Sequence, residues 1–257
     1  MRLYTTALKL SFKRALAYQG SFWLYVLVQA LTYLTIPFIY AGLSANSASL
    51  AGLPPGYVFL LTGIAEGIAL LYDFLIGAGI EEFASRVASG ELDYWLALPF
   101  RTPLSPLLVN PGALSLFCLP IPIWLIRAAR VSASLQRPGV LALALLMMLV
   151  SLAARAAYGL LYAAASVYLT RVYALGHLVN SLFTYAAFPS AVYRGAGKFI
   201  LTVIIPVALV ANVPAAAIVD GRLPASALLL VVVSAVLSAV GVLAFLRATR
   251  AYMSCGG

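Results

Sequence analysis

Residues 80–106 read IEEFASRVASGELDYWLALPFRTPLSP and form the one long polar interruption in an otherwise apolar sequence. Four of the seven acidic residues of the chain lie in this stretch. It divides at Gly90. Before that glycine, Glu82 and Arg86 stand four residues apart, which predicts a helix that carries both charges on the same side. After it, three prolines prevent the formation of a long helix.

The part of this stretch beyond the division is short, acidic and aromatic. Its characteristic residues are Gly90, Glu91, Leu92, Asp93, Tyr94, Trp95, Leu96 and Pro99. One interpretation is a docking surface for another protein at the membrane face. The other is a solvated loop between two helices, in which the two aromatic side chains lie at the level of the lipid headgroups.

The composition of the chain indicates a protein whose solvent is lipid. Of its 257 residues, 64% are hydrophobic and only 9% are charged, and the mean hydropathy is +1.04. A multispanning membrane protein requires such values, whereas a water-soluble fold does not. The formal net charge is +9, but the basic residues lie mostly at the ends of apolar runs, where they orient helices in the bilayer. No basic stripe with interleaved aromatic residues occurs, so nucleic-acid binding is not expected.

The rarer residue types predict no metal site and no disulfide framework. The single histidine, His177, has no cysteine, histidine or acidic partner at metal-ligand spacing. Cys118 lies in an apolar run and Cys255 lies near the C-terminus. The first apolar run is too long for the hydrophobic region of a signal peptide, so we expect it to remain as a membrane anchor.

The apolar runs predict six spans. Residues 1–18 are amphipathic and suit a helix in the cytoplasmic interface. Five spans are expected at about 21–43, 57–80, 108–126, 139–169 and 224–246.

The identity of the fifth span is open, because two stretches before the last span are apolar enough to cross. If residues 172–189 cross, then Pro189, Pro206 and Pro214 mark breaks in a re-entrant segment at 190–222, and nine basic residues lie inside against six outside. If residues 199–219 cross instead, the bias becomes eleven to four, which the positive-inside rule prefers. Both arrangements place the two termini in the cytoplasm.

Three ionisable residues fall within the predicted spans. Glu66 and Asp73 are seven residues apart in the second span and therefore share a helix face, and Arg155 interrupts the fourth. Charges at this depth are costly and mark functional sites or buried pairs. Both interpretations are open: a structural ion pair between Arg155 and one of the carboxylates, or a part of a transport path.

No catalytic or nucleotide-binding motif occurs, so we do not expect the chain to be an enzyme. The nearest approach to a phosphate-binding loop is Gly195-Ala-Gly197-Lys198-Phe199, which has Val192 in place of the first glycine and Phe199 in place of the serine or threonine that binds magnesium. A nucleophile elbow of the G-x-S-x-G kind is also lacking.

Two passages resemble a known family. Residues 88–99, ASGELDYWLALP, are similar to the G-(D/E)-L-D-x-x-L-x-x-P segment between the second and third spans of ABC-2-type transporter permeases. Residues 188–193, FPSAVY, followed by the prolines at 206 and 214, are similar to the proline-marked region before the last span of that family. With the amphipathic start and the six-span layout, the likeness covers nearly the whole chain.

This resemblance implies a fold and a set of partners. The fold is all-α and integral to the membrane: a single transmembrane domain over residues 1–257, with an interfacial helix at 1–18, a cytoplasmic coupling helix in the loop 80–106 and a re-entrant outer segment at 190–222. On this ground we favour 172–189 as the fifth span. The family pairs two permeases in the plasma membrane and drives them by separate cytoplasmic ATPase subunits that hold ATP and magnesium. This chain, which we expect to be prokaryotic, would bind no cofactor itself.

The resulting hypotheses differ in class. The first is the permease half of an ATP-driven exporter of a hydrophobic or amphiphilic substrate. The alternative is a self-sufficient proton- or ion-coupled carrier or channel, in which Glu66, Asp73 and Arg155 relay charge through the bilayer. A membrane-embedded enzyme acting on lipids is the third, and it lacks a catalytic constellation.

Overall fold

The computed structural model describes residues 2–17, 19–46, 55–93, 104–108, 110–130, 137–169 and 172–252. Throughout these ranges the regular structure is helical, and no strand occurs in them. The predicted all-α class is therefore confirmed for this part of the chain. A chain in lipid has no water to satisfy its backbone N–H and C=O groups, and a helix satisfies them internally.

The helices follow one another with short connections. In chain order, the α-helices are α1 (Arg2–Ala17), α2 (Gln19–Asn46), α3 (Pro55–Tyr72), α4 (Ala78–Ser89), α6 (Ala113–Cys118), α7 (Pro120–Ala128), α9 (Pro138–Tyr168), α10 (Val172–Thr184), α11 (Gly195–Phe199), α12 (Val207–Val210), α13 (Asn212–Asp220) and α14 (Ser226–Ala251). Two π-helical segments, η2 (Asp73–Gly77) and η6 (Ile200–Ile204), and three 3₁₀ turns, η3 (Ser105–Leu108), η4 (Tyr185–Ala187) and η5 (Ser190–Val192), complete the described structure.

In the described part of the chain, four helical stretches are long and apolar enough to cross a membrane: Gln19–Ile39, Gly56–Ser89, Pro138–Tyr168 and Ser226–Ala251. A fifth is counted if the pair Gly195–Ile204 and Val207–Asp220, which is bent by 70°, is one span. Many large apolar side chains on these helices are exposed, among them Trp23 on α2 and Leu228 on α14. Exposed apolar surface of this extent belongs in lipid or against a partner. The chain is thus a multi-pass membrane protein, and six crossings remain a prediction.

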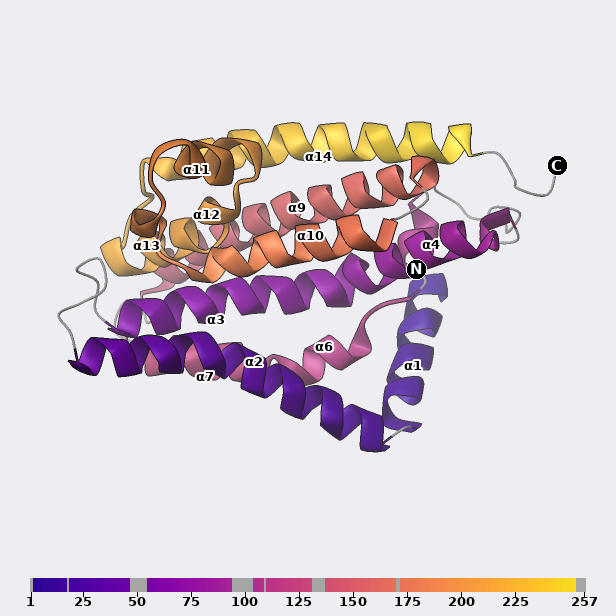
Figure 1. Cartoon of the computed structure of the whole chain (residues 1–257). Coiled ribbons are helices and arrows are strands. Elements are labelled where there is room, and N and C mark those ends of the chain that lie inside the picture. Colours follow the sequence, from indigo (N-terminus) through magenta and orange to yellow (C-terminus); the bar gives the residue numbers. More distant parts are fainter. Residues whose placement is uncertain are drawn as a thin grey trace.

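Figure 1 shows how the helices are arranged. The helices α2, α3, α9, α10 and α14 run along the length of one bundle, whereas α1 is steeply inclined to them. The start of α1, the end of α4 and the end of α14 lie at one end of the bundle, and α11, α12 and α13 gather at the other. The predicted interfacial helix therefore has a direction that suits the membrane surface. Ser11 fixes it in place by donating a hydrogen bond from Oγ to the carbonyl of Pro111, 2.6 Å away.

The helices at two of the predicted spans differ in length from those spans. The helix of the second predicted span continues beyond residue 80, through η2 and α4 to Ser89, because no proline interrupts it and Gly90 is the first residue there to adopt a left-handed φ. At the third predicted span lie the short helices α6 and α7, which together reach from Ala113 to Ala128 and are shorter than the four long stretches. Pro120 divides it: a proline lacks the N–H of a helix interior but suits the first position of α7.

Within the described residues, α9 and α14 share the most extensive contact between two helices. A Cβ atom added to Gly241 on α14 would lie 2.8 Å from the carbonyl oxygen of Ala157 and 3.4 Å from its Cα atom. The missing side chain allows the two backbones to approach, which is how helices associate in lipid, where no hydrophobic effect drives them together. Farther along the same contact, Phe245 is fully buried with its ring 5.3 Å from that of Phe83 on α4.

We predict that Gly241→Leu lowers the stability of the purified protein, because the new side chain has to push α14 away from α9. Overpacking of this kind costs about 1–3 kcal/mol. The measurement is the melting temperature in detergent, followed by intrinsic fluorescence. The matched control is Gly139→Leu, where a Cβ atom meets nothing within 4 Å. Equal melting temperatures for the two variants would contradict the packing described here.

Candidate functional site

Arg155 lies in the middle of α9 and is only 7% exposed. Its guanidinium is held between two rings: Cζ lies 4.7 Å from the ring centre of Tyr72 and 4.0 Å from that of Phe183. Nη2 donates a hydrogen bond to Oδ1 of Asn180 on α10, at 2.7 Å. Nε and Nη1 are buried without a hydrogen-bond partner. The cation is therefore stabilised mainly by aromatic faces, a contact that strengthens when water is excluded.

The expected ion pair between Arg155 and a carboxylate is not formed in this conformation. Among the described residues, no carboxylate oxygen of Glu66 or Asp73 lies within 4.0 Å of the guanidinium. Both carboxylates, and that of Glu81 on α4, still interact with Arg155 through space. The structure thus brings the three residues predicted from the sequence into one region without pairing them. The rings of Tyr72 and Phe183 and the amide of Asn180 contact the guanidinium in place of a carboxylate. The sequence did not predict these contacts.

A cavity of about 450 Å³ opens beside this region, between α2, α3, α4, α6 and α10. Its polar and aromatic lining consists of Tyr25, Tyr72, Asp73, Glu81, Ser115, His177 and Asn180. Asp73 begins the π-helical segment η2, and such segments are frequent at functional sites. No group of three or more metal-ligating side chains occurs in the described part of the chain. We call this cavity the polar cavity.

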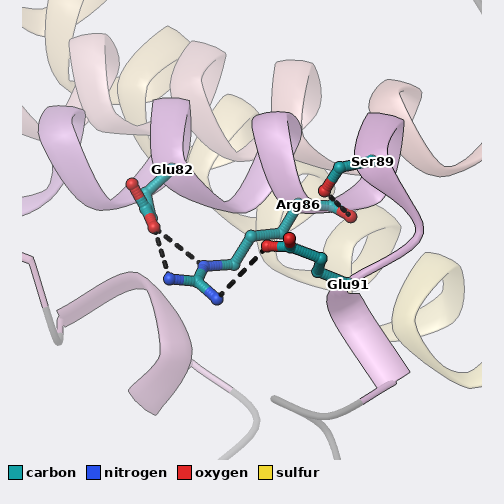
Figure 2. A network of polar contacts seen from close by, with 4 residues as sticks. All are labelled: Glu82, Arg86, Ser89 and Glu91. Atoms are coloured by element: carbon teal, nitrogen blue, oxygen red, sulfur yellow. Dashed lines mark hydrogen bonds and ion pairs between the residues drawn. The ribbon is translucent and has the colours of Figure 1, made fainter.

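The end of α4 carries a compact polar network, which Figure 2 shows from close by. Arg86 Nη2 lies 2.6 Å from Glu82 Oε1, so the pair predicted from the i,i+4 spacing is confirmed. Arg86 Nη1 also lies 4.0 Å from Glu91 Oε2, and Ser89 Oγ donates to the carbonyl of Arg86 at 3.3 Å. The network joins the last turn of α4 to the first residue beyond Gly90.

Gly90 ends α4 as the sequence predicts. Its φ of 77° is left-handed, a conformation that glycine adopts without a Cβ penalty. Two residues on, Leu92 is fully buried in a cluster with Phe83 and Phe245, whereas Glu91 and Asp93 on either side are exposed. Just after α4, therefore, the apolar side chain of Leu92 is buried in the bundle, whereas the acidic side chains of Glu91 and Asp93 lie at the surface. Tyr94, Trp95, Leu96 and Pro99 lie outside the described residues.

The segment between α10 and α14 is broken as expected from its prolines, and its freed backbone groups are satisfied by side chains. Pro189 precedes η5 and Pro206 precedes α12, whereas Pro214 lies in the first turn of α13, where a proline is tolerated. Tyr158 donates to the carbonyl of Ile204. Ser151 donates to that of Val210, at 2.8 Å.

Asn212 closes the same hairpin. Its Oδ1 accepts a hydrogen bond from the Ser190 N–H at 2.9 Å, and its Nδ2 donates to the carbonyl of Phe188 at 3.0 Å. If this segment lies at membrane depth, as the sequence predicts, its irregular backbone requires such shielding by protein. The bonding roles of Asn212, Ser151 and Tyr158 were not predicted; the signal for them was a polar side chain within an apolar stretch.

The comparisons with known proteins give one match. The family model described as ABC-2 family transporter protein matches residues 26–256. The chain therefore belongs to the ABC-2 transporter family, as the resemblance in the sequence predicts. Comparisons with curated proteins and with solved structures gave no match.

We predict that Asn180→Ala destabilises the protein, because it removes the one hydrogen bond of a buried guanidinium. A bond to a charged group contributes about 1.5–3 kcal/mol. Arg155→Met should destabilise it at least as much, because the nearby carboxylates of Glu66 and Asp73 then lose the cation that offsets their charge. The melting temperatures of both variants and of the double variant test this. An Arg155→Met variant as stable as the unchanged protein would contradict it.

Proposed function

We propose that the chain is the permease subunit of an ATP-binding-cassette exporter, which moves a hydrophobic or amphiphilic substrate out of a prokaryotic cell. Two permease copies form the path in the plasma membrane, and ATP with its magnesium is bound and hydrolysed by separate cytoplasmic subunits. Membership of the ABC-2 transporter family supports association with such ATPases. The observation that carries the proposal is the construction of the end of α4.

The end of α4 is suited to receiving a force from a soluble partner. The Glu82–Arg86–Glu91 network stiffens the last turn, and Glu91 and Asp93 present exposed carboxylates. The next two residues, Tyr94 and Trp95, supply the rigid aromatic side chains that commonly dominate binding energy at interfaces. We assign residues 90–99 as the segment that seats in the ATPase, and call it the coupling segment.

Leu92 connects this segment to the membrane bundle. Its buried neighbours include Phe83 on α4, Leu160 on α9 and Phe245 on α14. Because packed cores resist compression, a displacement of Leu92 is transmitted to these three helices together. Rigid-body rocking of this kind is a common way to alternate between inward-open and outward-open states.

We assign nucleotide hydrolysis to a separate ATPase subunit, because the one stretch of this sequence that resembles a phosphate-binding loop is helical. Gly195–Phe199 is the short helix α11, whereas a phosphate loop wraps its backbone N–H groups around the ligand. The alternative, a self-sufficient proton- or ion-coupled carrier, is not favoured, because the matching family is one of ABC transporters.

The second copy has apolar surface available to it. On α2, Leu24, Leu27 and Leu31 are more than half exposed, and on α14 Leu228 and Val236 are exposed as well. Such faces contact lipid in a monomer. We propose that part of this surface is covered by the partner permease, so that the substrate moves between the two copies.

We predict that the double variant Tyr94→Ala, Trp95→Ala abolishes substrate-stimulated ATP hydrolysis by the assembled transporter, because the aromatic contacts to the ATPase are lost. The measurement is the ATPase rate in nanodiscs with and without substrate. The matched control is Trp124→Ala on α7, which removes a tryptophan that is half exposed at the surface of the bundle. Unchanged stimulation in the double variant would refute the docking role of the coupling segment.

A second prediction separates docking from force transmission. Leu92→Ala should leave the ATPase bound but reduce transport per ATP hydrolysed, because the anchor between the coupling segment and the bundle is shortened. The cavity it creates costs about 2–5 kcal/mol, so a milder Leu92→Met variant is measured beside it. Transport and hydrolysis that fall in the same proportion, with the ATPase lost from the complex, would show that Leu92 serves binding alone.

A further inference from the structure

The region around the polar cavity holds more negative than positive side chains. Glu66, Asp73 and Glu81 interact through space with one another or with Arg155, the one cation among them. The chain as a whole is strongly basic, with a formal net charge of +9. Carboxylates are costly at membrane depth and are placed there for a partner or a ligand. Arg155 offsets one of the three and makes no direct ion pair with Glu66 or Asp73.

The excess negative charge faces the cavity, whereas the guanidinium does not. Asp73 and Glu81 both line the cavity, and Arg155 is absent from its lining. The nearest links of Arg155 to the cavity are indirect, through the ring of Tyr72 and through Asn180. A ligand that enters therefore meets two carboxylates before it meets any positive charge.

Aromatic rings lie beside these carboxylates. Tyr25 from α2 and Tyr72 from α3 line the same cavity as Asp73. The face of a tyrosine ring attracts a cation, most strongly one that is weakly hydrated and partly apolar, such as a quaternary ammonium. The volume of about 450 Å³ lies within the range of small-molecule sites, which combine apolar walls with a few polar groups.

We propose that the polar cavity binds an organic cation, with the positive group of the transported substrate between Asp73, Glu81 and the rings of Tyr25 and Tyr72. This inference rests on the proposed export function and names the chemical class of its substrate: an amphiphile with a cationic group. An anion is repelled by the two carboxylates. A metal ion lacks a ligand set, because no three metal-ligating side chains of the described residues converge.

The test uses the purified permease in phosphatidylcholine nanodiscs, without an ATPase. The probe is tritiated tetraphenylphosphonium, whose binding is measured by scintillation proximity after subtraction of empty nanodiscs. Asp73→Asn should weaken binding about tenfold, which corresponds to the loss of one close charge contact. Glu81→Gln, at an exposed position that tolerates the change, should weaken it about threefold.

Two controls make the result specific. Asp220→Asn removes an exposed carboxylate at the end of α13, outside the cavity lining, and should leave the affinity unchanged within about twofold. Benzyltrimethylammonium should displace the probe, whereas its neutral carbon isostere neopentylbenzene should not. Equal affinities for Glu81→Gln and Asp220→Asn, or equal displacement by the two competitors, would overturn the inference even if Asp73→Asn fails to fold.

The outcome is distinguishable from that of the export proposal. If the probe binds through Asp73 and Glu81 but transport by the permease proves not to need an ATPase, export by ATP is refuted and this site remains. ATP-driven transport by a permease that ignores the cation probe would refute this site and leave the export function in place.

Discussion

The helical segment between α10 and α14 is broken, which frees backbone N–H and C=O groups that no water can satisfy in lipid. The rest of the structure depends on which side chains satisfy these groups. The carbonyls of Ile204 and Val210 accept hydrogen bonds from Tyr158 and Ser151, both on α9. The same helix packs closely against α14 beside Gly241. Because α9 donates hydrogen bonds to this broken segment and also packs against α14, it fixes the positions of both.

Arg155 places a second demand on α9, because a buried guanidinium with two unpartnered nitrogen atoms is costly. Aromatic faces and one amide offset part of that cost, and the nearby carboxylates of Glu66 and Asp73 make no direct pair with it. The charge of Arg155 is thus stabilised, but no carboxylate of the described residues pairs with it directly. Such a site can accept a charged ligand or rearrange when the helices move. The end of α4, which is anchored through Leu92, shares a packed cluster with α9 and α14, so the proposed coupling and the proposed binding site involve the same helices.

The sequence predicted those features that arise from patterns along the chain. The apolar runs indicated the all-α class, and the i,i+4 spacing indicated the Glu82–Arg86 pair. Features that depend on rotation about helix axes were not predicted: an ion pair was one of the two interpretations of Arg155, whereas its guanidinium packs against Phe183 and bonds to Asn180. The sequence indicated a helix before Gly90 but not its continuity with the helix of the second predicted span, since hydropathy falls where a helix leaves the membrane although the helix itself continues.

The central claim is that a separate ATPase docks on the coupling segment. The most direct measurement replaces Trp95 by a photo-crosslinking amino acid, irradiates native membranes and identifies the adducts by mass spectrometry, with the same replacement at Trp124 as the reference. The account predicts an adduct between position 95 and a soluble subunit with a phosphate-binding loop, and none from position 124. Adducts at position 95 that contain only lipid, or the same proteins as at position 124, would contradict it.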